Sequence, residues 1–269
     1  MKLGIIAGNR LLPILLAQRI KQNNKDCKLT AFCFKGETSS IIRRYVDKIY
    51  WIKAGDLGGL KQSLKEDNIK KCVMAGQINP LRIFNRKGWD KELVFLAESI
   101  RDFRPHTIFQ AIISSIEKQG VEFLDSTFYL KEDLADEGIM NSLEPDKSLI
   151  GDIDFGLKVI SSFVELDAGQ SIVVKGGSVA AFESIEGTDN TIRRGAKLAG
   201  KGCVVLKFSK TNQDLRFDVP VVGVFTLKLL RNKKVKALVL EKNKVIILEK
   251  LKFLSLAKKW GIVVAGKRK

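Results

Sequence analysis

The sequence predicts an α/β protein with two domains. Between residues 1 and 90, short apolar runs alternate with amphipathic stretches, as expected for parallel strands joined by helices. A second series of strands and helices begins near residue 149 and has its own apolar runs, and the stretch between the two series is polar and aperiodic. We therefore expect an N-terminal Rossmann-like, parallel-sheet domain at 1–132, a linker at about 133–148, and a C-terminal mixed-sheet α/β domain at 149–269.

The N-terminal elements follow from hydrophobic periodicity. Four apolar runs have the length and composition of buried strands, at 2–8, 29–34, 48–55 and 71–76. Apolar residues at helical spacing predict helices at 11–24, 59–68 and 91–118, the last with a break near Arg104-Pro105 because proline disfavours helix before it.

The C-terminal elements are predicted in the same way. Strands are expected at 202–209, 216–223, 234–241, 244–249 and 261–266, and helices at 152–169, 188–200 and 253–261. Residues 170–184 are typical of a hairpin that turns at Gly176-Gly177. Thr188 or Asp189 is expected to cap the helix at 188–200.

Cysteine and histidine usage argues against a zinc site. The chain has four cysteines, none in a CxxC pair, and a single histidine, His106. The cysteines lie in or next to apolar runs, which predicts buried thiols in a reducing compartment, and His106 is expected to be structural. We expect neither a signal peptide nor a membrane span, since no run of 18 apolar residues occurs.

The net charge of +17 is concentrated near the C-terminus. Residues 228–269 hold 14 Lys or Arg against two acidic residues, Glu241 and Glu249. Such a surface attracts nucleic acid, anionic lipid or a polyanionic substrate, although solvated lysines explain it equally well. No nucleic-acid motif accompanies the charge, so no nucleic-acid partner is expected.

Two glycine turns are candidate ligand-facing turns. Gly8-Asn9 and Gly76-Gln77 each follow a predicted strand, and ligands of parallel sheets gather at the carboxyl ends of the strands. A tight turn between strand and helix explains both glycines as well. The first turn is not a GxGxxG fingerprint, because Arg10 and Leu11 follow Asn9, and a nicotinamide cofactor is disfavoured.

A second candidate is the stretch EGTDNTIRR at 186–194. The turn at Gly187-Thr188 enters a helix, whose free backbone N–H groups suit phosphate, and Arg193 or Arg194 adds charge. Asp189 could instead hold a metal that bridges phosphate oxygens. An ordinary capped helix is the alternative. Lys207 is a further candidate phosphate ligand at a strand end.

A third candidate is QDLRFDVPVVG at 213–223. If this stretch is a strand, Asp214, Arg216 and Asp218 share one face. Two carboxylates and a guanidinium suit a hard cation and a phosphate, whereas a solvent-facing edge strand, which Pro220 would suit, is the alternative.

At these clusters the chain resembles the LpxI family, the UDP-2,3-diacylglucosamine pyrophosphatases of lipid A biosynthesis. Matching stretches follow one another along nearly the whole chain. They are GIIAG with LLP at 4–13, VMAGQI at 73–78, DSTFYL at 125–130, GDIDFGLKVI at 151–160, LDAGQSIVV at 166–174, FESIEGTDNTIRR at 182–194 and KFSKTNQDLRFDVPVVG at 207–223. One departure is Asn9-Arg10, where a glycine-rich turn is expected.

The resemblance implies a ligand cleft between the two domains and Mg²⁺-dependent hydrolysis of UDP-2,3-diacylglucosamine to 2,3-diacylglucosamine 1-phosphate (lipid X) and UMP. It also implies a cytoplasmic protein peripheral at the inner membrane of Gram-negative bacteria. It marks Asp218 as essential and metal-binding, with Asp214 beside it.

We expect Asp218, helped by Asp214 or Asp189, to hold Mg²⁺ against the pyrophosphate, where the metal neutralises charge and activates a water for in-line attack. The amides of Gly187, Thr188 and Asp189, with Lys207 or Arg193, are expected to contact the remaining oxygens. The substrate-binding set is completed by residues of the other matching stretches, Gly8, Asn9, Gly76, Gln77 and Gln170.

With such a lipid substrate, we expect the basic C-terminal region to bind the anionic membrane surface. A homodimer is possible. The main alternative is a nucleotide-sugar binding protein or transferase of similar layout. Release of UMP, with and without Mg²⁺, separates the two.

Overall fold

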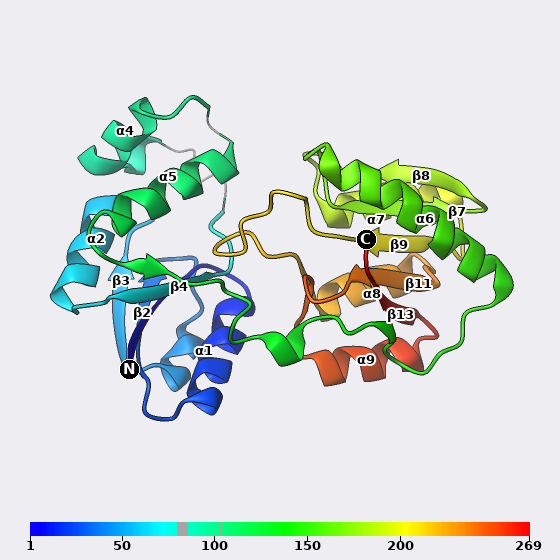
Figure 1. Ribbon diagram of the computed structural model, residues 1–269, viewed down its shortest axis with the longest axis horizontal. Helices are drawn as coiled ribbons and strands as arrows, with labels where there is room; N and C mark the ends of the chain where they lie inside the picture. The colour runs from blue at the N-terminus through cyan, green and yellow to red at the C-terminus, as the bar shows by residue number, and fades with distance from the viewer. Residues whose placement is uncertain (80–85, 103) are drawn as a thin grey trace. The chain divides into compact units, whose positions relative to one another are not determined.

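The computed structural model describes residues 1–79, 86–102 and 104–269, which divide into two compact units (Figure 1). The first unit holds Met1–Leu130 together with Leu215–Asp218, and the second holds Lys131–Asp214 together with Val219–Lys269. The stretch expected as a linker lies within the second unit, where Asp133 and Ala135 are fully buried.

The first unit is built on a five-stranded parallel sheet, which confirms the Rossmann-like prediction. Its strands, in spatial order, are β3 (Lys48–Ile52), β2 (Lys28–Phe34), β1 (Lys2–Ala7), β4 (Lys71–Ala75) and β5 (Glu122–Phe123). Each neighbouring pair is parallel. The strand order reverses between β1 and β4, the position at which open parallel sheets bind their ligands.

Helices cover both faces of this sheet (Figure 1). On one face, Ile6 and Phe32 pack in a single core with α2 (Leu57–Glu66), α4 (Lys91–Glu98) and α5 (Pro105–Glu117). On the other, α1 (Leu12–Asn23) lies against β1 and β4 and beside the 3₁₀ turn η1 (Ser40–Tyr45). A second 3₁₀ turn, η2 (Arg86–Gly88), precedes α4. The predicted break is present, because α5 begins at Pro105 with Arg104 as its N-cap.

The second unit has a mixed sheet, as predicted. Its strands, in spatial order, are β6 (Gly138–Ile139), β13 (Val263–Lys267), β11 (Ala237–Glu241), β9 (Val204–Lys207), β7 (Ser171–Lys175) and β8 (Ser178–Phe182). The three middle strands β13, β11 and β9 are parallel, and β6, β7 and β8 are antiparallel to their neighbours. The hairpin of β7 and β8 turns where predicted, with positive φ at Gly176 and Gly177.

Alternation along these strands builds two cores. Val174 and Leu206 face α6 (Lys147–Glu165). Val173 and Val205 face the other side of the sheet, which is covered by α7 (Thr188–Ala199), α8 (Val224–Asn232) and α9 (Lys250–Lys259) (Figure 1). Two short strands, β10 (Val221–Val222) and β12 (Ile246–Ile247), form a separate parallel pair, and the 3₁₀ turn η3 (Lys131–Asp133) opens the unit.

Two local predictions were wrong. Residues 208–220, all within the described chain, form turns and irregular backbone, and the predicted strand is reduced to β10. Pro220, which lacks a backbone N–H, immediately precedes that short strand. The N-cap of α7 is Gly187 and not Thr188 or Asp189, because the cap has a φ of 78°, which favours glycine.

The prediction of buried thiols is confirmed, since all four cysteines are free and buried; the reducing compartment remains a prediction. Burial raises the pKa of the Cys33 and Cys72 thiols to about 12. Among the helices that the structure describes, none is both long enough and apolar enough to cross a bilayer.

Candidate functional site

The two predicted glycine turns meet at the carboxyl ends of β1 and β4. The N–H of Gly8 donates to the carbonyl of Ala75 at 2.8 Å, and the N–H of Asn9 donates to the carbonyl of Gln77 at 2.7 Å. A Cβ on Gly8 would overlap the Gln77 backbone, and a Cβ on Gly76, where φ is 85°, would overlap the Asn9 carbonyl. Close approach of the two turns therefore requires both glycines.

Asn9 and Arg10 stand where a glycine-rich turn was expected. Arg10 adopts a φ of 66°, the left-handed conformation that glycine favours. The amide Nδ2 of Asn9 donates to Glu37 Oε2 at 2.8 Å, while its buried Oδ1 has no hydrogen-bond partner within the described part of the chain. A buried acceptor of this kind at the strand-order reversal is suited to a ligand donor.

The segment Leu215–Asp218 belongs to the first unit, where Ser126 holds it. The Ser126 hydroxyl lies 2.5 Å from the carbonyl of Met74, near the end of β4, and 2.9 Å from the carbonyl of Arg216. The N–H of Ser126 donates to the carbonyl of Leu215 at 3.2 Å. Ser126 thus ties the aspartate segment to the same sheet edge as the two glycine turns.

Side chains of α5 complete this attachment. Arg216 Nη1 lies 3.0 Å from Glu117 Oε1. The Phe217 ring stacks on Phe109, with centroids 5.8 Å apart, and lies 5.3 Å from the ring of His106. His106 is exposed, and its ring contact with Phe217 places it beside the aspartate segment.

Asp214 and Asp218, which were expected on one face of a strand, belong to different units of the structure. Asp214 lies in the second unit and Asp218 in the first, and Asp214, Arg216 and Asp218 are on turns and irregular backbone, not on a strand. The predicted alignment of these side chains by strand alternation is therefore wrong. Both aspartates are half-buried.

In the second unit, predicted residues converge at the carboxyl end of β9. Lys207, the last residue of β9, is only 5% exposed, and its Nζ donates to Thr188 Oγ1 at 2.8 Å. Thr188, the first residue of α7, in turn donates to Glu183 Oε2 at 2.9 Å and lies 3.3 Å from the Ser171 hydroxyl. A buried ammonium is thus positioned beside the N-terminus of a helix that no side chain caps.

Gln170 belongs to the same edge, since its carbonyl accepts from the N–H of Phe208 at 2.9 Å. Its buried Oε1 and the buried Nε2 of Gln213 have no hydrogen-bond partner among the residues that the structure describes. The edge therefore offers an unused acceptor and an unused donor close to the chain that follows Lys207.

Asp189 and Arg193 point to solvent from α7. Both are exposed, and Arg193 Nη1 donates to Asn190 Oδ1 at 2.9 Å. The neighbouring Arg194 instead forms an ion pair with Glu186, and hydrogen bonding from Arg194 lowers the pKa of the Glu186 carboxyl. Of the two α7 arginines, Arg194 is thus the one paired with a carboxylate, and no such pair is seen for Arg193 among the residues that the structure describes.

Sequence reasoning missed the residues that support these side chains. Glu183, Ser171 and Ser126 are buried and were not singled out. Glu241, also buried, accepts from both the N–H and the hydroxyl of Ser209 and so fixes the backbone just after Lys207. A carboxylate or hydroxyl at the end of an apolar strand was the available signal.

The donor set suits a hard cation, although no cage is preformed. Nowhere in residues 1–79, 86–102 and 104–269 do three His, Cys, Asp or Glu side chains gather as metal ligands. Magnesium is usually held by one or two carboxylates, substrate phosphates and water, so Asp218, Asp214 and Asp189 fit as single carboxylate donors.

Comparisons with known proteins match both units. The model of the LpxI N-terminal domain matches residues 2–133, and the model of the LpxI C-terminal domain matches residues 136–265. The UDP-2,3-diacylglucosamine pyrophosphatase LpxI of Caulobacter vibrioides is 26% identical over 275 residues, which cover 98% of this chain and 97% of that protein. Among solved structures, glycinamide-RNase-transformylase T of Mycobacterium tuberculosis is similar with a TM-score of 0.26 and 11% identity, over 68% of this chain and 44% of that one. This chain thus spans less than half the length of that solved chain.

Proposed function

Because the chain belongs to the LpxI family along nearly its whole length, we propose that it hydrolyses the pyrophosphate bond of UDP-2,3-diacylglucosamine. The products are 2,3-diacylglucosamine 1-phosphate and UMP. The single observation that carries the proposal is the match of both family models, in order, to the two halves of the chain. The cleft expected between the domains remains a prediction.

The Lys207 cluster supports the proposal on chemical grounds. A diphosphate carries negative charge that increases as the bond breaks, and Lys207 offers a buried positive charge beside the first amides of α7. Thr188 orients the ammonium by accepting from it, and Glu183 orients Thr188. Gln170, whose backbone carbonyl accepts from the N–H of Phe208 at the same edge, would bind a neutral polar group of the substrate.

The carboxylate role falls to Asp218. Its segment is held by Ser126, Glu117 and Phe109, so that the backbone beside Asp218 is fixed before substrate binds. Asp218, with Asp214 or Asp189, would hold Mg²⁺, which when bound neutralises charge on the phosphate oxygens. Asn9, with its unused acceptor, would contact the substrate at the glycine turns.

Release of UMP by the purified protein tests the function. Wild-type protein is expected to release UMP from UDP-2,3-diacylglucosamine with Mg²⁺ and not with EDTA. Asp218→Ala is expected to lower kcat at least about a hundredfold while substrate binding stays measurable. Asp26→Ala, at an exposed turn aspartate of the same unit, is the matched control and should keep wild-type activity.

Two results would contradict this proposal. Normal UMP release by Asp218→Ala would remove the role of that carboxylate. Binding of the nucleotide-sugar without UMP release by the wild type would instead favour a binding protein or a transferase.

The proposal includes an anionic membrane surface as partner, because the substrate carries two acyl chains. On the helices α8 and α9, Phe225 and Leu251 are 80% and 87% exposed. Exposed lysines accompany them, and Lys228 Nζ lies 5.8 Å from the Phe225 ring. Apolar side chains among cations are suited to insertion at an anionic headgroup layer.

A further inference from the structure

The turn after β2 brings a carboxylate to the two glycine turns of the first unit. Glu37 lies in this turn, and its backbone N–H donates to the carbonyl of Phe34 at 3.0 Å. The next residue, Thr38, is buried; its hydroxyl accepts from the N–H of Phe34 at 2.9 Å and donates to the carbonyl of Ala7, the last residue of β1. The backbone that carries Glu37 is thereby tied to the strand end that leads into Asn9.

The Glu37 carboxylate links groups that follow three neighbouring strands. Its Oε2 accepts from the side-chain Nδ2 of Asn9 at 2.8 Å and from the backbone N–H of Asn79 at 3.3 Å. Asn9 follows β1, and Asn79 lies in the chain that leaves β4. One carboxylate oxygen after β2 thus holds a side chain after β1 and a backbone group after β4.

This contact decides which end of the Asn9 amide is left for a ligand. A carboxylate offers acceptors only, so Glu37 binds the amide through its nitrogen and cannot bind it through its oxygen. The Oδ1 of Asn9 is the atom that remains, and it is buried without a hydrogen-bond partner in the part of the chain that the structure describes. An unpaired buried acceptor costs free energy, which a donor from a ligand would recover.

The ligand group that fits this oxygen is a neutral hydrogen-bond donor. A phosphate oxygen is itself an acceptor, and it would also meet the negative charge of Glu37 nearby. A hydroxyl or an N–H of a base or sugar carries the required hydrogen and no charge. The Lys207 cluster has the opposite character, since it offers a buried positive charge to an anion.

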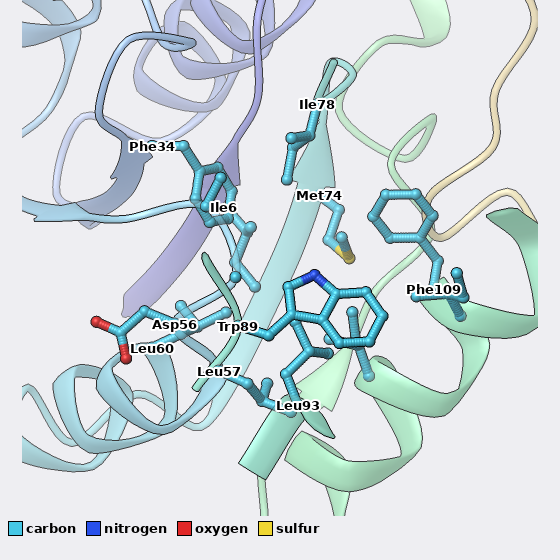
Figure 2. A pocket seen from close by; sticks show the side chains of 14 residues that line it. Ile6, Phe34, Asp56, Leu57, Leu60, Met74, Ile78, Trp89, Leu93 and Phe109 are labelled. Carbon is cyan, nitrogen blue, oxygen red and sulfur yellow. The ribbon is translucent and has the colours of Figure 1, made fainter. Parts of the chain in front are cut away.

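The apolar interior next to these strand ends offers little to such a group. Ile6, Phe34 and Met74 of β1, β2 and β4 line a cavity of about 60 Å³ (Figure 2). Of the described residues that line it, Asp56 alone is ionisable, and its carboxylate caps α2. A polar ligand group that entered this cavity would lose its hydration without a replacement, so the selective contact lies at the turns.

We propose that Glu37 is a positioning residue of the substrate site: it fixes the Asn9 amide so that the oxygen is presented to a hydroxyl or an N–H of the nucleotide-sugar. The inference rests on the proposed function for the identity of the ligand. Its physical basis is separate, namely an acceptor-only carboxylate that orients an amide. Asn9 stands where a glycine-rich turn was expected, and glycine has no side chain through which such selection could operate.

A double-mutant cycle measures the coupling between the two residues. The dissociation constant of UDP-2,3-diacylglucosamine is measured in EDTA, where no turnover is expected, for wild type, Asn9→Ala, Glu37→Ala and the double variant. Each single substitution is expected to weaken binding about three- to tenfold, the effect of one hydrogen bond. In the Asn9→Ala background, Glu37→Ala should add less than about twofold, because it acts through the amide that is already absent.

Further variants separate positioning from a general effect on structure. Glu66→Ala removes an exposed glutamate at the last residue of α2 and is the matched control, which should bind as wild type. Glu37→Gln keeps an oxygen that can accept from Asn9 and should bind more tightly than Glu37→Ala. With Mg²⁺ present, KM should follow the dissociation constants while kcat changes less. Thermal unfolding establishes that all variants are folded.

Inorganic pyrophosphate tests which part of the substrate faces Asn9. Its inhibition of UMP release should be the same in wild type and Asn9→Ala, because the group at Asn9 is not a phosphate. Weaker inhibition in Asn9→Ala would show that this turn binds the diphosphate and would overturn the assignment.

The outcomes separate this inference from the proposed function. UMP release by the wild type together with independent effects of the two substitutions, or with unchanged binding in Glu37→Ala, overturns the role of Glu37 and leaves the hydrolase intact. Coupled losses of binding without UMP release support the role of Glu37 and overturn the hydrolase.

Discussion

Lys207 shows most clearly how single residues define the second unit's site. An ammonium that is 5% exposed is costly unless it is hydrogen-bonded and balanced by charge. Thr188 accepts from Lys207 and donates to the buried Glu183, so that one hydroxyl links the two charged groups. Removing that hydroxyl should disturb both of them.

Thr188→Val is therefore expected to lower the free energy of unfolding by about 1–3 kcal/mol, because buried charged groups lose a partner. UMP release should fall as well, since the ammonium is no longer oriented. Urea denaturation and the UMP assay measure the two effects. Thr226→Val, at a half-buried threonine of α8, is the control, and equal stability of both variants would contradict the role given to Thr188.

Sequence reasoning found the lysine and the neutral polar residues of this cluster and missed its carboxylate. Lys207, Thr188 and Gln170 were predicted, but Glu183 reads as a surface charge in the sequence. The Glu183 backbone is closely approached by Gly169, where an added Cβ would overlap the Glu183 carbonyl. Such a contact is fixed by tertiary packing and leaves no local periodic signal.

At the scale of elements, Asp67 connects the amino ends of the strands in the first unit. It follows α2 and accepts from Thr30 of β2 at 2.6 Å, and its carboxylate lies 3.1 Å from Lys2 Nζ and 2.7 Å from Lys48 Nζ. Burial alone would raise the pKa of Asp67, but the hydrogen bonds from Lys48, Thr30 and Lys2 outweigh it and lower that pKa.

The lowered pKa sets the sign of a pH dependence. The Asp67 contribution to stability is present above the ordinary aspartate pKa of about 3.9 and is lost as pH falls toward the folded-state value. Asp67→Asn should therefore show a smaller loss of unfolding free energy than wild type between about pH 6 and pH 3. Urea titrations across that range measure it, with Asp26→Asn as control. An equal loss of unfolding free energy in wild type and Asp67→Asn as the pH falls would contradict the role given to Asp67.

Regular elements were predictable where local chemistry and period agreed. The glycine pair at 176–177 fixed the hairpin, and the apolar runs of β1, β2 and β4 fixed the parallel sheet. The irregular backbone of residues 208–220 was not predictable, because Asp214, Arg216 and Asp218 alternate along the sequence in the same way as residues on one face of a strand. The positions of these residues are set by Ser126, Glu117 and Phe109, which lie far away in the sequence.

At the scale of the whole molecule, the basic excess predicts salt-sensitive membrane binding. Wild-type protein should float with vesicles that contain anionic phosphatidylglycerol and not with phosphatidylcholine alone. Replacing the exposed Lys233, Lys258 and Lys259 by Gln should weaken binding about fivefold or more for each lysine near the surface.

A variant with the same loss of charge elsewhere is the control for this prediction. Lys25, Lys65 and Lys70 are exposed lysines of the first unit, and their replacement by Gln should leave flotation nearly unchanged. Flotation that is insensitive to salt, or lost equally in both variants, would contradict an electrostatic surface on α8 and α9.

The segment Leu215–Asp218 belongs to the first unit, whereas the residues on either side of it belong to the second. This limits which fragments of the protein can be studied separately. A fragment ending at residue 133, where the first family model stops, lacks Leu215–Asp218. It would leave Phe109 and the Ser126 hydroxyl without the contacts that Phe217 and Arg216 supply, and it would lack the aspartate proposed as essential. The complementary fragment would carry that tetrapeptide with nothing to dock against. Expression of the isolated halves is therefore a poor test of what either half does. Because the two halves share this segment, we expect such fragments to be inactive, even when they are mixed.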